Sequence, residues 1–248
     1  MSKLPNAPLI EVIFELKWQP TQEDLKGYQY LIGDLYSLIK DEFPERETLI
    51  VFSPETPAPF PIMHLPMHKF SKEKGKYPLV QTGQGLLTVN TIDESYIWED
   101  YRKAIIKNID NLHTAAIKTT SFNNLTASLA YYDFFSFDFN KGDIIAFLKE
   151  NLHIEVNQTF YSEKVPPIGC NIQLLYDYKD GKVSIAIQRG IAQNKEGIII
   201  QTLVNSNIIN FESSKISSWL DEAQQICSET FKNMTKGTLF DSFKLKKQ

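Results

Sequence analysis

The stretch NAPLIEVIFELKW, residues 6–18, carries the clearest secondary-structure pattern of the chain. Its apolar side chains alternate with polar ones: Val12, Phe14 and Leu16 share one face, and Glu15 lies on the other. Because successive side chains of a strand point to opposite faces, this alternation predicts a strand with one face on an apolar core and the other toward water or polar partners. We therefore expect the rest of the fold to be arranged around it.

The composition is that of a globular protein that does not read nucleic acid. The chain has 248 residues, of which 42% are hydrophobic and 23% charged, enough to build a sizeable core. Its formal net charge is -4, and its arginines are limited to Arg46, Arg102 and Arg189. Arginine is the preferred side chain for bidentate contacts to bases and phosphates, so this scarcity argues against a nucleic-acid-binding surface.

Targeting and redox features point to the cytoplasm. We find neither an apolar run near the length of a membrane span nor a charged-then-apolar leader at the N-terminus. Cys170 and Cys227 are too few for a disulfide framework, and each lies in an apolar pattern typical of a small buried residue. We expect a cytoplasmic protein without disulfides.

After the first strand, Thr21 and Asp24 form a capping signal for a helix that ends before Pro44. The first half then continues with a short strand, a proline-rich connector, an extended segment, a hairpin and a second helix, at residues 49–52, 53–61, 62–70, 77–91 and 96–116.

The same order of elements begins again after a polar linker at 118–124. A long aromatic strand, a helix, an extended segment and a proline-containing connector are predicted at 126–139, 141–151, 154–160 and 162–168. Strands at 170–178 and 183–188 flank an Asp-Gly turn, a further strand follows at 198–204, and the last long helix runs from 213 to 237.

The pattern predicts an α+β fold, with antiparallel sheets whose helices pack on one face. It predicts two similar halves, each strand–helix–strands–helix, at 1–118 and 119–248. One continuous two-lobed domain is the alternative. The similarity concerns element order, and no repeat at the level of residues supports it.

Three segments together resemble a known family: Asn6–Glu15 (NAPLIEVIFE), Leu129–Phe135 (LAYYDFF) and the terminal helix from Trp219 to Phe231. They are similar, in the same order, to a sporadically distributed prokaryotic family of about this length that has no established activity. The first segment is the most specific. The resemblance implies no cofactor or catalytic residue, and its patchy distribution implies a link to mobile, defence-related or toxin-linked genes.

No motif for catalysis or metal binding stands out. His64 and His68 are four residues apart, but Pro66 between them argues against a helix that would bring them together. Gly83 and Gly85 join two strands and open no helix, so they form a turn rather than a phosphate loop. We therefore assign no catalytic, cofactor-binding or metal-binding residue, and favour a protein that is not an enzyme.

Two functions from different classes remain. The first is a non-catalytic binding or regulatory protein that acts through protein–protein interaction or self-association. Its predicted interface is the outer face of the last helix and the segment after it: Asp221, Glu222, Gln225, Glu229, Leu239, Phe240 and Phe243. The second is a small-molecule sensor or enzyme that uses a cleft between the halves, lined by Tyr131, Asp133 and Arg189.

Overall fold

The computed structural model describes residues 4–50, 63–92, 94, 96–116, 120–157 and 166–244. Its strands are β1 Leu9–Gln19, β2 Glu45–Thr48, β3 His68–Ser71, β4 Leu79–Gly83, β5 Leu86–Ile92, β6 Asn123–Ser136, β7 Asn171–Tyr178, β8 Gly181–Ala192 and β9 Lys195–Ser206. Its helices are α1 Gln22–Ile39, α2 Trp98–Ala116, α3 Ile144–Leu152, α4 Ser213–Thr235 and α5 Thr238–Ser242.

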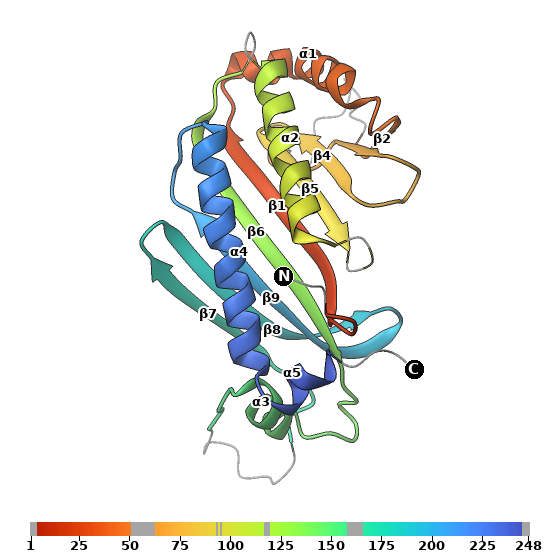
Figure 1. Cartoon of the computed structure of the whole chain (residues 1–248), viewed down its shortest axis with the longest axis vertical. Helices are drawn as coiled ribbons and strands as arrows, with labels where there is room; N and C mark the ends of the chain where they lie inside the picture. Colours follow the sequence, from red (N-terminus) through yellow and green to blue (C-terminus); the bar gives the residue numbers. More distant parts are fainter. Residues whose placement is uncertain are drawn as a thin grey trace. The chain divides into compact units, whose positions relative to one another are not determined.

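The strands form one nine-stranded sheet in the order β2-β3-β4-β5-β1-β6-β9-β8-β7 (Figure 1). The pairs β2–β3, β3–β4, β4–β5 and β7–β8 are antiparallel, and the last three join strands with short connections, as expected. The prediction of an α+β fold with an antiparallel sheet is confirmed.

The central strand β1 lies between β5 and β6 and has the predicted alternation. Val12, Phe14 and Leu16 are fully buried, whereas Ile13 and Glu15 between them are half-buried. The ring of Phe122 packs edge-on against the buried Trp18, with ring centroids 5.1 Å apart. The apolar face of β1 therefore covers the core, as its sequence predicts.

Two compact units can be distinguished. Unit 1 comprises residues 1–11, 130–204 and 223–248, and unit 2 comprises residues 12–129 and 205–222. The predicted division into halves at 1–118 and 119–248 stays a prediction.

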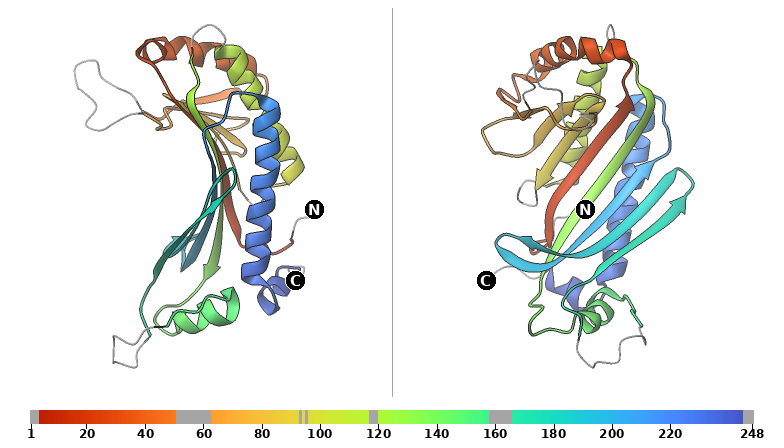
Figure 2. Two further views of the ribbon diagram at one scale, coloured as in Figure 1. Left: turned by 90° about the vertical axis from the view of Figure 1, so that its left-hand side faces the viewer. Right: turned by 180° about the vertical axis from the view of Figure 1, so that it is seen from behind.

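In unit 2, α1 and α2 contact each other and lie on the same side of the strands (Figure 2). The α1 side chain Tyr36 stacks on Phe70 of β3. From α2, the Tyr101 hydroxyl donates to the Val89 carbonyl oxygen at 2.6 Å. Both helices thus cover the apolar face of this part of the sheet.

The start of α1 follows its predicted capping box. Thr21 Oγ1 accepts from the Asp24 N–H, and Asp24 Oδ2 accepts from the Thr21 N–H. Asp24 Oδ1 also accepts from the Ser121 N–H at 3.0 Å, so a single carboxylate caps the helix and ties the segment before β6 to it.

In unit 1, an aromatic cluster joins the end of α4 to β6. Phe243 is buried against Phe231 of α4 and Phe135 of β6, with ring centroids 5.7 and 6.2 Å away. Phe147 of α3 packs edge-on against Phe135 at 6.5 Å. These contacts make the short segment after α4 part of the core of unit 1.

The structure differs from the sequence prediction in the first edge strand. The described edge strand is β2, Glu45–Thr48, which begins four residues before the strand predicted at 49–52 and pairs with β3 so that Thr48 lies opposite His68. Residues 51–52 of the predicted strand lie outside the described residues. An edge strand is paired on one side only and tolerates charged residues. A prediction based on apolar residues therefore placed the strand too late in the sequence. The connector predicted at 53–61 lies outside the described residues, as do 158–160 of the extended segment.

The described elements follow strand–helix–strands–helix twice along the chain, with β1 beside β5 and β6 beside β9 in the sheet. Shared element order is not itself a duplication. The internal duplication stays a prediction that superposition of the two halves would test.

Candidate functional site

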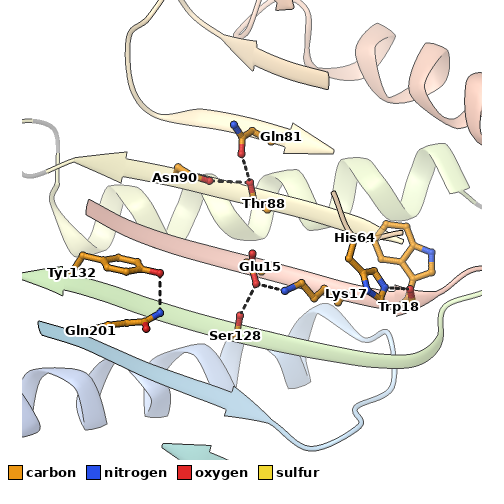
Figure 3. Close-up of polar contacts among 10 residues, drawn as sticks. All are labelled: Glu15, Lys17, Trp18, His64, Gln81, Thr88, Asn90, Ser128, Tyr132 and Gln201. Carbon is orange, nitrogen blue, oxygen red and sulfur yellow. Dashed lines mark hydrogen bonds and ion pairs between the residues drawn. The ribbon is translucent and has the colours of Figure 1, made fainter. Parts of the chain in front are cut away.

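Glu15 makes polar contacts on the face of β1 opposite the buried Phe14 and Leu16. Its Oε2 atom accepts from Lys17 Nζ at 2.5 Å and from Ser128 Oγ of β6 at 3.3 Å (Figure 3). The ammonium group balances the carboxylate. This contact therefore fixes β1 against β6 and offers charged and hydroxyl groups within unit 2.

A second polar contact lies on the neighbouring strands (Figure 3). Thr88 Oγ1 of β5 is 2.8 Å from Asn90 Oδ1 and 3.3 Å from Gln81 Oε1 of β4. The hydroxyl has a single proton and so donates to one of these oxygens at a time. The two contacts together comprise one carboxylate, one ammonium group, two hydroxyls and two side-chain amides.

The predicted interface on α4 is partly engaged within the protein. Asp221 accepts two hydrogen bonds from Arg102 of α2, at 2.6 Å from Nε and 2.8 Å from Nη2. Arg102 Nη2 also donates to Ser217 Oγ at 2.6 Å. The hydrogen bonds that Arg102 donates to Asp221 raise the pKa of Arg102 further. Asp221 therefore joins α2 to α4 inside unit 2.

The other predicted interface residues fall into two groups. Gln225 and Glu229 are exposed and bonded to each other, Nε2 to Oε1 at 2.9 Å, while Glu222 is half-buried. Leu239 and Phe240 are half-buried. Phe243, in contrast, is buried in the aromatic cluster of unit 1, so its ring packs inside the protein.

The three predicted cleft residues have separate surroundings in unit 1. Asp133 is buried on β6 near Cys227, and burial together with the Asp133 charge raises the pKa of the Cys227 thiol. Tyr131 is half-buried on the same strand. Arg189 of β8 donates to Glu196 and to the Ile168 carbonyl oxygen. The observed contacts thus engage Arg189 at the β8–β9 hairpin and place Asp133 beside α4.

The histidines of the considered metal pair make unrelated contacts. His64 Nε2 lies 2.9 Å from the Trp18 carbonyl oxygen (Figure 3), whereas the His68 ring stacks on Tyr28 at 6.1 Å. Within the part of the chain that the structure describes, no three His, Cys, Asp or Glu side chains gather closely enough to hold a metal ion.

Sequence reasoning missed an apolar groove in unit 1. It has a volume of about 610 Å³ and lies between the C-terminal half of α4, the β7–β8 hairpin and the end of α3. Its lining residues are Leu152, His153, Ile154, Leu174, Tyr176, Val183, Ile185, Ile226, Thr230, Asn233 and Met234. We name this site the α4–β7 groove.

The sequence does contain a signal for the groove: the helix α4 and the strand β7 carry more apolar residues than one buried face needs. Ile226 and Met234 continue the predicted apolar stripe of α4, yet both are only half-buried. On β7, Leu174 is 37% exposed and Tyr176 is 50% exposed. The stripe and the strand are therefore more apolar than the core of unit 1 requires, which an analysis of periodicity alone does not reveal.

Comparison with known proteins does not assign a function to these sites. Of the helices that the structure describes, none has both the length and the apolar character that crossing a membrane requires. No family model matches the chain, and no curated protein matches it either.

Proposed function

We propose that this chain is a non-catalytic binding or regulatory protein that acts through protein–protein interaction, and that the α4–β7 groove is its binding surface. The observation that carries the proposal is an apolar groove of about 610 Å³ whose strand wall, at Leu174 and Tyr176, is exposed to solvent. Exposed apolar patches of this kind are typical of interaction sites.

The chemistry of the lining favours an apolar occupant. The described lining residues include no carboxylate, ammonium or guanidinium group, and their polar side-chain groups belong to His153, Tyr176, Thr230 and Asn233. A few polar groups among apolar ones can fix the orientation of a bound side chain without supplying catalysis.

A protein segment fits better than an isolated small molecule because the apolar surface continues past the groove. Leu175, which alternates with the two groove residues of β7, is 61% exposed on the opposite side of the strand. A polypeptide that follows β7 would cover both sides, whereas a ligand confined to the groove would leave Leu175 in water.

The second candidate function, a small-molecule sensor, is supported by the volume of the same groove. About 610 Å³ falls within the roughly 300–1,000 Å³ usual for ligand pockets. The location differs from the cleft predicted from Tyr131, Asp133 and Arg189. Cytoplasmic location and the link to defence-related genes stay predictions.

Two matched α4 variants test the proposal. Met234→Glu places a carboxylate in the groove, and Gln225→Glu makes the same kind of change on the exposed side of α4. Tagged wild-type protein and both variants are used to isolate partners from the native host, and the captured protein is then purified and titrated by calorimetry. We expect wild type and Gln225→Glu to bind it, and Met234→Glu to bind at least about tenfold more weakly.

The two candidate functions give different outcomes. If native mass spectrometry finds a small molecule on wild type that is missing from Met234→Glu, and no protein partner responds to the variant, the sensor function replaces the interaction function. A partner that binds Met234→Glu as tightly as wild type would contradict the groove as the binding surface.

A further inference from the structure

The two outer strands of the sheet are protected to very different degrees. β2 has four residues, Glu45–Thr48, of which three are charged and all are exposed. Short, charged edge strands resist pairing with other chains. β7 has eight residues, NIQLLYDY, with Asp177 as its single charge and no proline. β7 therefore lacks the usual protection of an edge.

The outer edge of β7 is long and regular. All eight residues pair one-to-one with β8, from Asn171 opposite Gln188 to Tyr178 opposite Gly181, so the strand contains no bulge. Among the described residues, no strand lies on its other side. Its outward backbone groups and its exposed apolar side chains form a ready template for one more strand.

We propose that a second copy of this chain covers this edge, with the two β7 strands antiparallel about a twofold axis at Leu175. In this register Leu175 lies opposite Leu175 of the second copy, and Leu174 lies opposite its Tyr176. The apolar residues of each copy are thus covered by apolar residues of the other, as an isologous interface requires.

The charge pattern of β7 favours this occupant and this register. Asp177 lies opposite Gln173 of the second copy, whose side-chain amide can donate to the carboxylate, and no two like charges face each other. A shift by two residues would instead set Leu175 opposite the polar Gln173 or opposite the charged Asp177. Of these neighbouring registers, the one centred at Leu175 pairs apolar residues with apolar residues, and it keeps both grooves on the same side of the extended sheet.

A second copy on β7 would itself be a polypeptide that covers Leu175, so the inference shares this residue with the proposed function, but the two are tested separately. The inference concerns the edge of β7, and Leu175 points away from the α4–β7 groove because it alternates with the groove residues Leu174 and Tyr176. Variants of Leu175 therefore test the edge, and variants of Met234 on α4 test the groove.

Sedimentation of the whole chain provides the first test. The monomer has a mass of 28.5 kDa, so a dimer has 2 × 28.5 = 57.0 kDa. We expect wild type at about 100 µM to be dimeric. Leu175→Lys places two ammonium groups opposite each other and should raise the dissociation constant at least about tenfold. Gln188→Lys, exposed on the inner strand β8, should leave it unchanged.

Cross-linking tests the register. In a Cys170→Ser background, Leu175→Cys places two thiols on directly opposite residues, whose Cα atoms are about 4.5–5.5 Å apart and within reach of a disulfide. Leu174→Cys places them on diagonal residues, about 7–8 Å apart. Mild oxidation should therefore link the Leu175→Cys chains into dimers much faster than the Leu174→Cys chains.

Three results would each overturn the proposal: a monomeric wild type at that concentration, a Leu175→Lys variant that dimerises as well as wild type, or equal cross-linking at both positions. Circular dichroism and thermal melting of each variant verify that it is folded. Leu175 is exposed, so the Lys substitution should change the melting temperature little.

Discussion

Shortening Phe14 tests the central role of β1. Its side chain is 0% exposed on the apolar face of the strand. Removing the buried ring forfeits a transfer free energy of about 1.5–3 kcal/mol, and the cavity left behind adds to this. Phe14→Ala should therefore lower the free energy of unfolding by about 3–5 kcal/mol. Phe14→Asp should be worse, because it leaves an unpaired charge in the core.

Ile13→Ala provides the matched control on the same strand. Ile13 is half-buried on the opposite face, so its truncation should cost only about 1 kcal/mol. Urea unfolding of wild type and both variants, followed by far-ultraviolet circular dichroism and tryptophan fluorescence, gives the free energies. Since a domain of this kind has a total stability of about 5–15 kcal/mol, a loss of 3–5 kcal/mol shifts the midpoint clearly.

The reasoning fails if the Phe14→Ala variant unfolds within about 1 kcal/mol of wild type, or if Ile13→Ala costs as much. Either result would mean that the two faces of β1 are buried alike, and that the alternation in the sequence does not reflect the core.

Three further predictions concern other parts of the fold. Asp24→Ala should cost about 1–2 kcal/mol in urea unfolding, because the carboxylate accepts two backbone N–H groups, and a loss below 0.5 kcal/mol would contradict its capping role. Gly83→Ala should destabilise by more than about 1 kcal/mol, since its Cβ would lie 1.8 Å from the Leu65 carbonyl oxygen, whereas Gly33→Ala in α1 meets no atom within 4 Å and should be neutral or stabilising. Burial raises the pKa of the Cys227 thiol, so above about pH 9 the unfolded chain releases a proton that the folded chain keeps. The stability should then fall with pH by up to about 1.4 kcal/mol per unit, and Cys227→Ala, compared with wild type in urea midpoints between pH 8 and 10.5, should show a shallower fall.

Local patterns predicted most of the secondary structure. The alternation of residues 10–18 placed β1 and its buried face, and Thr21 with Asp24 placed the start of α1. Such features depend on residues only a few positions apart, so they can be predicted directly from the sequence. The start of the edge strand was predicted at Leu49 rather than at Glu45 because the position of β2 depends on its pairing with β3, about twenty residues further along.

The candidate site could not be predicted in the same way. The α4–β7 groove brings together Leu174 and Ile226, and the ion pair that engages Asp221 comes from Arg102, 119 residues earlier. Phe243 reads as a surface residue of a short tail, yet it is buried against β6.

The sequence by itself determined which residues are apolar, where most strands and helices begin, and that they form an antiparallel α+β fold. Only the tertiary structure decided which apolar residues the core covers and which it leaves exposed. The physical reason is that burial depends on contacts between segments far apart in the chain. A wide apolar stripe indicates that a surface is more stable when it is buried. The packing of the other elements determines whether it is buried within the same molecule or left for a partner.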